Sequence, residues 1–175
     1  ATTNITETDA LSFGITSTAS ISEDAPGTAT FTVNLGGVTL ANGNTASVDI
    51  THIGSATDAT DHQAFLTQLD AVVTTTAGVT LAGNTLTFDD SFVGPTLAFD
   101  VTAIDDSLVE GTETLALTLT NVVGGAINGA QTTATTNITE TDALSFGITS
   151  TASISEDAPG TATFTVNLGG VTLAN

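Results

Sequence analysis

An internal repeat constrains the fold of this chain more than any other feature of its sequence. Residues 1–42 return letter for letter as residues 134–175. Identity over 42 positions does not arise by chance, so the 175 residues are a window on a tandem array with a 133-residue unit. Such a window holds one complete unit and part of another, and its ends need not coincide with domain boundaries.

Alternation of apolar and polar residues predicts a β-protein. Leu115, Leu117 and Leu119 alternate with threonines and Ala116, which is the period-2 pattern of a half-buried strand. Six further strands are expected at residues 11–21, 28–35, 46–53, 86–88, 96–104 and 132–140, with turn-forming residues between them. Residues 62–84 fit a short helix as well as a strand. Seven short strands predict an all-β, seven-stranded antiparallel β-sandwich.

The pattern also predicts the domain organisation. We expect residues 10–142 to form the complete domain and residues 1–9 to be the last strand of a preceding repeat. Residues 143–175 would be the first strands of a following repeat, which cannot fold alone.

The charge of the chain excludes several classes of partner. It has 19 acidic residues, no lysine or arginine, two histidines and a net charge of -19. Nucleic acid and anionic lipid are bound through basic residues, so neither is an expected partner. The chain has no apolar run long enough for membrane insertion, and any secretion signal would lie outside this stretch. Without cysteine there are no disulfides or thiolate metal ligands.

The acidic residues gather at one predicted end of the sandwich. Residues 10–142 contain 15 acids, and ten of them fall in the loops after the first, third and fifth strands or at the exit of the last. These ten are Glu23, Asp24, Asp58, Asp61, Asp105, Asp106, Glu110, Glu113, Glu140 and Asp142. In an antiparallel sandwich these loops share one pole, which we call the acidic pole.

Crowded carboxylates need a counter-charge that the chain itself lacks. Two carboxylates about 4 Å apart repel by roughly 4 kcal/mol at an effective dielectric constant near 20. Ca²⁺ accepts six to eight oxygen ligands from flexible loops, whereas Mg²⁺ requires a stricter octahedron. The pattern therefore favours a calcium site, and the alternative is a solvated acidic cap.

Several motifs of the unit resemble the Calx-β domain. They are Ile21-Ser22-Glu23, then 56–62 (ATDATDH), then Leu86-Thr87-Phe88, then Ile104-Asp105-Asp106 with Glu110 and Glu113, and finally Ile138-Thr139-Glu140-Thr141-Asp142. The most specific part is the Asp-Asp-x-x-x-Glu-x-x-Glu pattern before an alternating strand. The resemblance covers residues 10–142 and implies a seven-stranded immunoglobulin-like sandwich.

The resemblance also implies a set of Ca²⁺ ligands. Carried over position by position, they are Glu23, Asp61, Asp105, Asp106, Glu110, Glu113 and Asp142, together with Glu140. The chain departs from the family pattern in three places. His62 replaces a tyrosine, residues 63–84 look like an insertion, and the final acidic run is thinner.

No pattern of the chain points to an enzyme. It has no serine nucleophile elbow with a His and an acid, no phosphate-binding glycine loop, and no aromatic-lined pair of carboxylates. His52 reads as a packed strand residue. His62 beside Asp61 is an alternative ligand for a transition metal, although one histidine with scattered acids is a weak pattern.

These observations predict an extracellular or cell-surface structural repeat of a stalk, adhesin shaft or filament, stiffened by Ca²⁺ between repeats. Its expected partners are neighbouring identical repeats or subunits, and any surface or glycan ligand would bind through domains outside this stretch. One alternative is a calcium sensor or a Thr-rich module that binds ice or glycan. Another is a filament of separate subunits that exchange strands.

Overall fold

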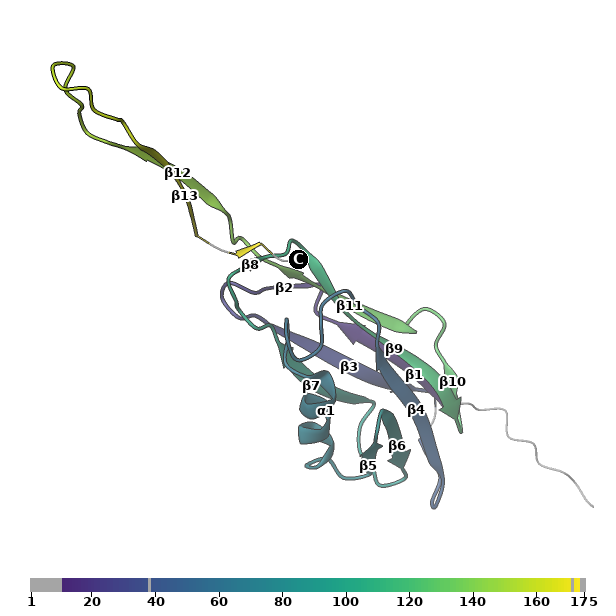
Figure 1. Cartoon of the computed structure of the whole chain (residues 1–175). Helices are drawn as coiled ribbons and strands as arrows, with labels where there is room; N and C mark the ends of the chain where they lie inside the picture. Colours follow the sequence, from purple (N-terminus) through teal and green to yellow (C-terminus); the bar gives the residue numbers. More distant parts are fainter. Residues whose placement is uncertain (1–10, 38, 171, 174–175) are drawn as a thin grey trace, which may run out of the picture.

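The structure is a β-sandwich with one short helix and a projecting hairpin. We describe a computed structural model over residues 11–37, 39–170 and 172–173 (Figure 1). Its elements are β1 (Ser12–Ser17), β2 (Ser20–Ser22), β3 (Thr28–Gly36), β4 (Thr45–His52), α1 (Phe65–Val73), β5 (Val79–Ala82), β6 (Thr85–Asp89), β7 (Thr96–Thr102), β8 (Leu108–Val109), β9 (Glu113–Val123), β10 (Ala126–Ile127), β11 (Thr133–Thr139), β12 (Ser145–Ser150), β13 (Phe164–Gly169) and β14 (Thr172–Leu173).

Two sheets form the sandwich. One has the strand order β10-β1-β3-β7 and the other the order β2-β11-β9-β4-β6-β5. Neighbouring strands are antiparallel except for the pairs β1 with β10 and β2 with β11, which are parallel. The predicted all-β sandwich class is confirmed.

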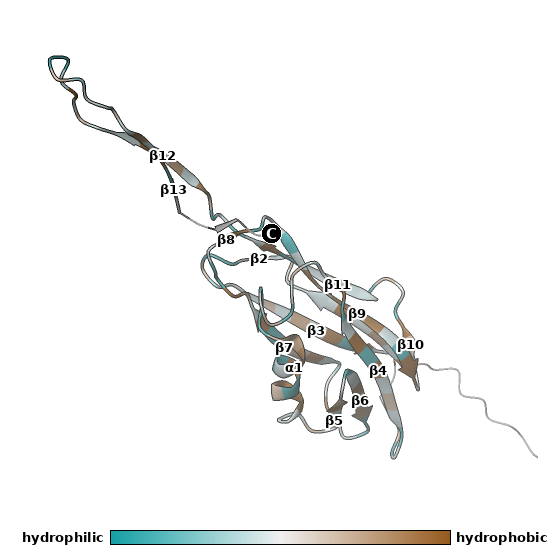
Figure 2. Cartoon of the chain, in the orientation of Figure 1, coloured by the Kyte–Doolittle hydropathy of each residue, from teal (hydrophilic) through white to brown (hydrophobic). Residues whose placement is uncertain are grey.

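The alternating residues fill the space between the sheets. Phe31 and Val33 of β3 and Leu115 and Leu117 of β9 are fully buried, as their period-2 spacing predicts. Figure 2 shows the corresponding apolar stripes on the strands. The rings of Phe13 and Phe88, one from each sheet, lie 5.8 Å apart and connect the two layers.

The prediction of one continuous strand over residues 11–21 is wrong, because this segment contributes to both sheets. β1 pairs with β3, whereas β2 pairs with β11 in the other sheet. At the crossing, the Thr18 N–H donates to the Thr30 carbonyl at 3.2 Å, and the Ala19 carbonyl accepts the Asn137 N–H at 3.0 Å. Each sheet thus keeps its backbone hydrogen bonds while the chain passes between them.

Residues 62–84 form a helix followed by a strand. Phe65, Leu69 and Val73 recur every fourth residue, and these three side chains of α1 are buried. The helix packs against β7 and β5, which are the edge strands of the two sheets. It therefore covers an edge that would otherwise be open to pairing. Among the described residues, no helix has both the length and the apolar character needed to cross a membrane.

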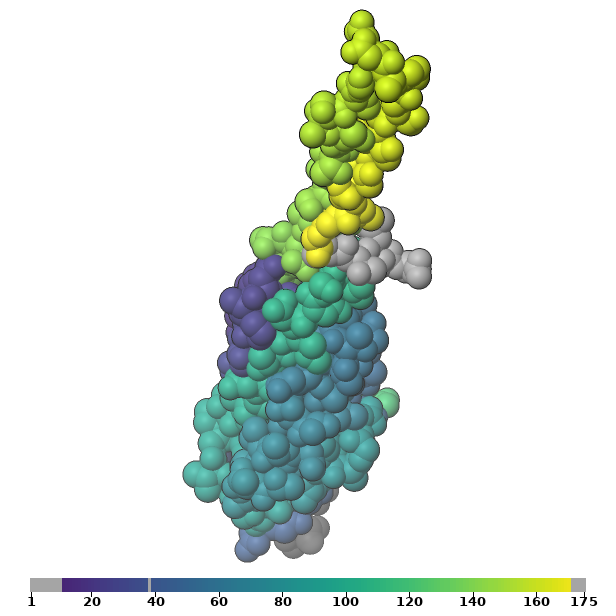
Figure 3. Space-filling view, turned by 60° about the vertical axis from the view of Figure 1, so that its left-hand side comes forward, coloured from purple at the N-terminus to yellow at the C-terminus, as the bar shows by residue number. Residues whose placement is uncertain are grey.

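The hairpin of β12 and β13 has the sequence of β1 and β3, but within the described residues no second sheet packs against it. Ser12 pairs with Gly36 in the first copy and Ser145 with Gly169 in the second, so the register is the same. The hairpin extends away from the sandwich (Figure 3). Phe31 is fully buried in β3, whereas its counterpart Phe164 is 67% exposed in β13. The expected role of residues 1–9 lies outside the described residues.

This pair of identical residues gives a test of the fold. Phe31→Ala should lower the free energy of unfolding by about 3–5 kcal/mol, because it removes a buried ring and leaves a cavity. Phe164→Ala should change it by about 0.5 kcal/mol or less, since an exposed ring contributes little. Denaturant unfolding of the two variants measures both values. Equal destabilisation would contradict the arrangement.

Candidate metal centre

Four segments of the backbone meet at the acidic pole. The Glu23 N–H, just after β2, donates to the Thr139 carbonyl at the end of β11, at 2.9 Å. The Ile104 N–H, after β7, donates to the Asp61 carbonyl at 2.9 Å. The first bond joins the loop after β2 to the exit of β11, and the second joins the loops after β4 and β7. The Ala103 N–H donates to the Gly27 carbonyl at 2.9 Å and connects the two pairs, so acidic residues distant in sequence are held at one end of the sandwich.

Three carboxylates form the centre of this pole. One oxygen from each of Asp61, Glu110 and Glu113 can be chosen such that all three lie within 4.8 Å of one another. Asp61 is buried, and Glu110 and Glu113 are half-buried. Carboxylates at this spacing repel one another unless a proton or a cation lies between them.

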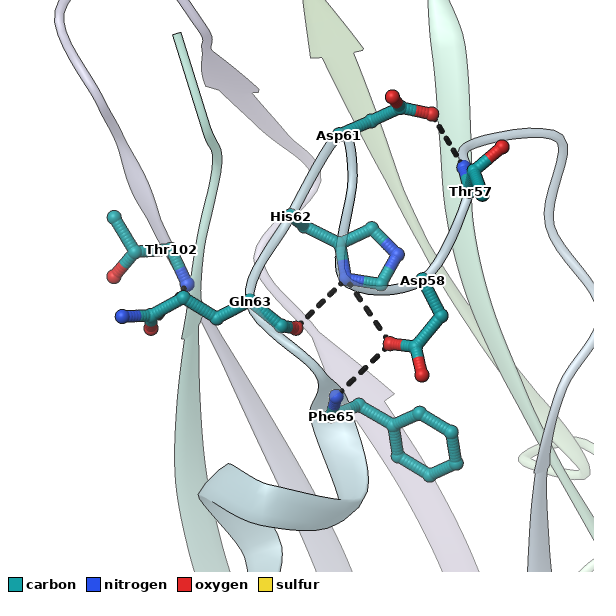
Figure 4. A network of polar contacts seen from close by, with 7 residues as sticks. All are labelled: Thr57, Asp58, Asp61, His62, Gln63, Phe65 and Thr102. Carbon is teal, nitrogen blue, oxygen red and sulfur yellow. Dashed lines mark hydrogen bonds and ion pairs between the residues drawn. The ribbon is translucent and has the colours of Figure 1, made fainter.

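The loop after β4 fixes Asp61 through the contacts drawn in Figure 4. The Thr57 N–H donates to the Asp61 carboxylate. Asp58, counted at the acidic pole from the sequence, points instead toward the helix, where its Oδ1 accepts the Phe65 N–H at 3.0 Å. It is therefore a structural residue of the α1 terminus and lies outside the cluster of three carboxylates.

His62 supports this loop from the core. Its ring is fully buried, and its Nδ1 lies 2.9 Å from the Gln63 carbonyl oxygen and 3.6 Å from an oxygen of Asp58. The His52 ring packs against it with centroids 5.2 Å apart. The His52 ring also lies 6.3 Å from the Phe65 ring, so it packs among other rings, which agrees with the prediction for His52.

Burial and crowding raise the pKa of two glutamates. The pKa of Glu23 rises from 4.5 to about 7, chiefly because the side chain is buried, and further because Glu140, Asp106 and Glu110 are close. An opposing hydrogen bond from the Asp106 backbone lowers it only in part. For Glu113, burial, a hydrogen bond with Asp61 and neighbouring carboxylates raise the pKa to about 7. Below about pH 7 both groups therefore hold protons that a cation could replace.

Glu140 links the last strand to the loop that carries Glu110. Its Oε1 accepts the Glu110 N–H at 2.7 Å and the Gly111 N–H at 2.8 Å. Its Oε2 is buried and has no hydrogen-bond partner among the described residues. A buried carboxylate oxygen without a donor is costly, and a bound cation would satisfy it.

The outer rim of the pole contains the remaining predicted ligands. Asp142 is half-buried, and its pKa is raised by partial desolvation and by Asp24, Glu140, Asp105 and Asp106 around it. Asp24 accepts the Thr141 hydroxyl at 2.9 Å, which lowers the pKa of Asp24. The sequence placed Asp24 at the pole without giving it a role, and the structure shows that it holds the segment leaving β11.

The structure thus brings the eight predicted ligands into one connected group. Asp61, Glu110 and Glu113 form its centre, Glu23, Asp106 and Glu140 surround it, and Asp105 and Asp142 lie at the rim. All of these donors are carboxylate oxygens, which suit a hard cation such as Ca²⁺ better than a transition metal. Metal binding by these residues stays a prediction.

The raised pKa values predict how stability depends on pH when divalent cations are chelated. Between about pH 4.5 and 7, Glu23 and Glu113 bind more protons in the folded state than in the unfolded state. The free energy of unfolding should therefore fall as the pH rises through this interval. Glu113→Gln should make this fall smaller, and Asp70→Asn on α1 should leave it unchanged.

Thermal unfolding in chelator across this pH range measures the effect. Burial lowers the pKa of His52 and acts in the opposite direction, so the comparison with Glu113→Gln isolates the carboxylate. A pH profile that Glu113→Gln and Asp70→Asn alter equally would contradict the assignment.

The fold is shared with a solved Calx domain. The apo-form Calx CBD1 domain aligns with 76% of this chain and 99% of its own length, at 18% identity and a TM-score of 0.50. The calcium-binding domain CBD12 of CALX1.1 aligns with 74% of this chain and 44% of its own length, at 20% identity and a TM-score of 0.47. CBD12 of CALX1.2 aligns with 78% of this chain and 48% of its own length, at 19% identity and a TM-score of 0.42. No protein-family model and no curated protein sequence matches the chain. The chain therefore has the Calx-β fold that its motifs resemble.

Proposed function

We propose that the chain is part of an extracellular structural repeat, in a stalk, adhesin shaft or filament, and that Ca²⁺ at the acidic pole stiffens it. The observation that carries the proposal is the group of carboxylates around Asp61, Glu110 and Glu113. Two of its members have a pKa near 7, and one buried oxygen of Glu140 finds no donor in the described part of the chain. The whole sequence contains no lysine or arginine to neutralise them.

Calcium fits this group better than other common cations. The donors are oxygens from several loops, and Ca²⁺ tolerates the irregular geometry that loops provide. Zn²⁺ would favour histidine or cysteine, and the chain has no cysteine.

The position of the pole suggests a mechanical role. β11 ends at Thr139, and Glu140 and Asp142 lie between it and the hairpin that begins with β12 at Ser145. A cation bound by these two residues and by the loop with Glu110 would hold the exit of one unit against the start of the next. Removal of the cation would restore the repulsion between carboxylates and loosen the connection.

The uncovered hairpin is what a continuous array would complete. β12 and β13 expose Phe146, Ile148, Phe164, Val166 and Leu168, whose counterparts in the first copy pack against the sandwich. In an array, each such hairpin would be covered by the rest of its own unit, whereas in the alternative filament a strand of a neighbouring subunit would complete the sheet. The mass of the denatured natural material distinguishes a long chain from short subunits.

Thermal unfolding with and without Ca²⁺ tests the calcium proposal. A cation present at 100 times its dissociation constant adds about 2.7 kcal/mol to stability, which corresponds to a rise in Tm of several degrees. Glu113→Gln and Asp61→Asn should each remove most of the rise, because each deletes a charge from the centre of the cluster. Circular dichroism melts in millimolar Ca²⁺ and in chelator measure it.

The control is Asp70→Asn, which removes one acid from α1 and should leave the calcium-dependent rise intact. A rise in Tm that persists in both cluster variants would place the cation elsewhere. No rise at millimolar Ca²⁺ would leave the acidic pole as a solvated cap.

A further inference from the structure

The structure contains a contact between the acidic pole and the segment that follows the hairpin. β14 pairs in parallel with β8, with Thr172 opposite Leu108 and Leu173 opposite Val109. β8 lies inside the acidic loop, between Asp106 and Glu110. The partner of this loop is therefore a part of the following repeat.

The repeat defines where this partner lies in a complete unit. Residues 172–173 are the counterparts of residues 39–40, at the 133-residue spacing. The hairpin before them keeps the register of β1 and β3, so β14 follows β13 as residues 39–40 follow β3. In the complete unit, β3 runs from the acidic pole to the opposite pole, and residues 39–40 therefore lie at the end away from the carboxylates.

In the complete unit, residues 39–40 pair with no strand among the described residues. Thr39 and Leu40 belong to no strand. They line a cavity of about 460 Å³ together with the apolar residues Leu11, Leu35 and Phe92 and the acidic residues Asp89 and Asp90. Leu108 and Val109 of β8 are apolar and half-buried, so their chemistry matches the apolar part of this wall.

We propose that residues 39–40 and the cavity beside them receive β8 of a preceding copy of the unit. The structure shows this pairing once, between β8 and β14, and the repeat requires the same surface on every unit. Successive units would then be joined head to tail by a two-residue parallel ladder in addition to the covalent chain. This inference rests on the proposed tandem array and names the surfaces that meet in it.

Both ends of β8 are held by candidate ligands. The Leu108 N–H donates to the Asp106 carboxylate at 2.7 Å, and the Glu110 N–H donates to Glu140 at 2.7 Å. A cation that orders these carboxylates would therefore also order β8. These hydrogen bonds connect β8, which would dock on the following unit, to the acidic pole.

Disulfide formation tests the pairing, because the chain has no cysteine of its own. Val109→Cys with Leu173→Cys should close an intramolecular disulfide roughly a hundredfold faster than cysteines on separate chains, since neighbouring groups on one chain have a high effective concentration. The matched control is Val109→Cys with Leu40→Cys, the same residue in the same local sequence at the other pole. It should form no intramolecular disulfide.

The pairing should persist when the following unit is complete. A chain lengthened after Asn175 by a further copy of residues 43–142 provides that unit. The Val109→Cys and Leu173→Cys pair should close in it as well, at a rate that falls when Ca²⁺ is chelated. Absence of the disulfide in the lengthened chain would overturn the proposed pairing of β8 with the following unit, even if Ca²⁺ still raised the Tm. A disulfide that closes equally fast in chelator would support this pairing but contradict the claim that the cation orders β8.

Discussion

Repulsion between carboxylates that no basic residue neutralises is the constraint on which the rest of this structure depends. The sandwich brings the ends of several strands together, and at one pole these ends carry Asp61, Glu110, Glu113 and their neighbours. The protein can relieve the repulsion by retaining protons, as the raised pKa values of Glu23 and Glu113 indicate, or by binding a cation. The hydrophobic core supplies the stability that holds these groups at close range.

The same carboxylates connect the interior of one unit to the beginning of the next. Glu140 follows the last strand and accepts two backbone N–H groups from the loop that contains β8. β8 in turn pairs with β14, which lies beyond the hairpin. Protonation or cation binding at the pole therefore acts on the segment through which neighbouring units would meet. Stability, calcium binding and the stiffness of an array would be three consequences of one local arrangement.

Much of the fold could be predicted from the sequence, because it follows from local periodicity. The buried positions of β3 and β9 follow from strict alternation, and the acidic pole follows from the rule that successive antiparallel strands reverse direction. The crossing of residues 18–19 between sheets could not be predicted, since it depends on tertiary hydrogen bonds to Thr30 and Asn137. The two-residue strands β8 and β10 are too short for any periodic pattern.

The candidate site was also predictable only in part. Counting acids in the loops placed ten residues at the pole, and the resemblance to the Calx-β domain implied eight of them as ligands. The structure brings these eight together, but the count also included Asp58, whose carboxylate instead accepts a helix N–H. The raised pKa of Glu23 and the Glu140 oxygen that lacks a donor among the described residues depend on burial, which the sequence does not specify. Titration calorimetry with Ca²⁺ in buffers of different ionisation enthalpy tests the central claim most directly. Below about pH 7 the account predicts binding that releases protons, with the release vanishing at higher pH as Glu23 and Glu113 ionise. Absence of binding at millimolar Ca²⁺, or binding without proton release in this range, would contradict it.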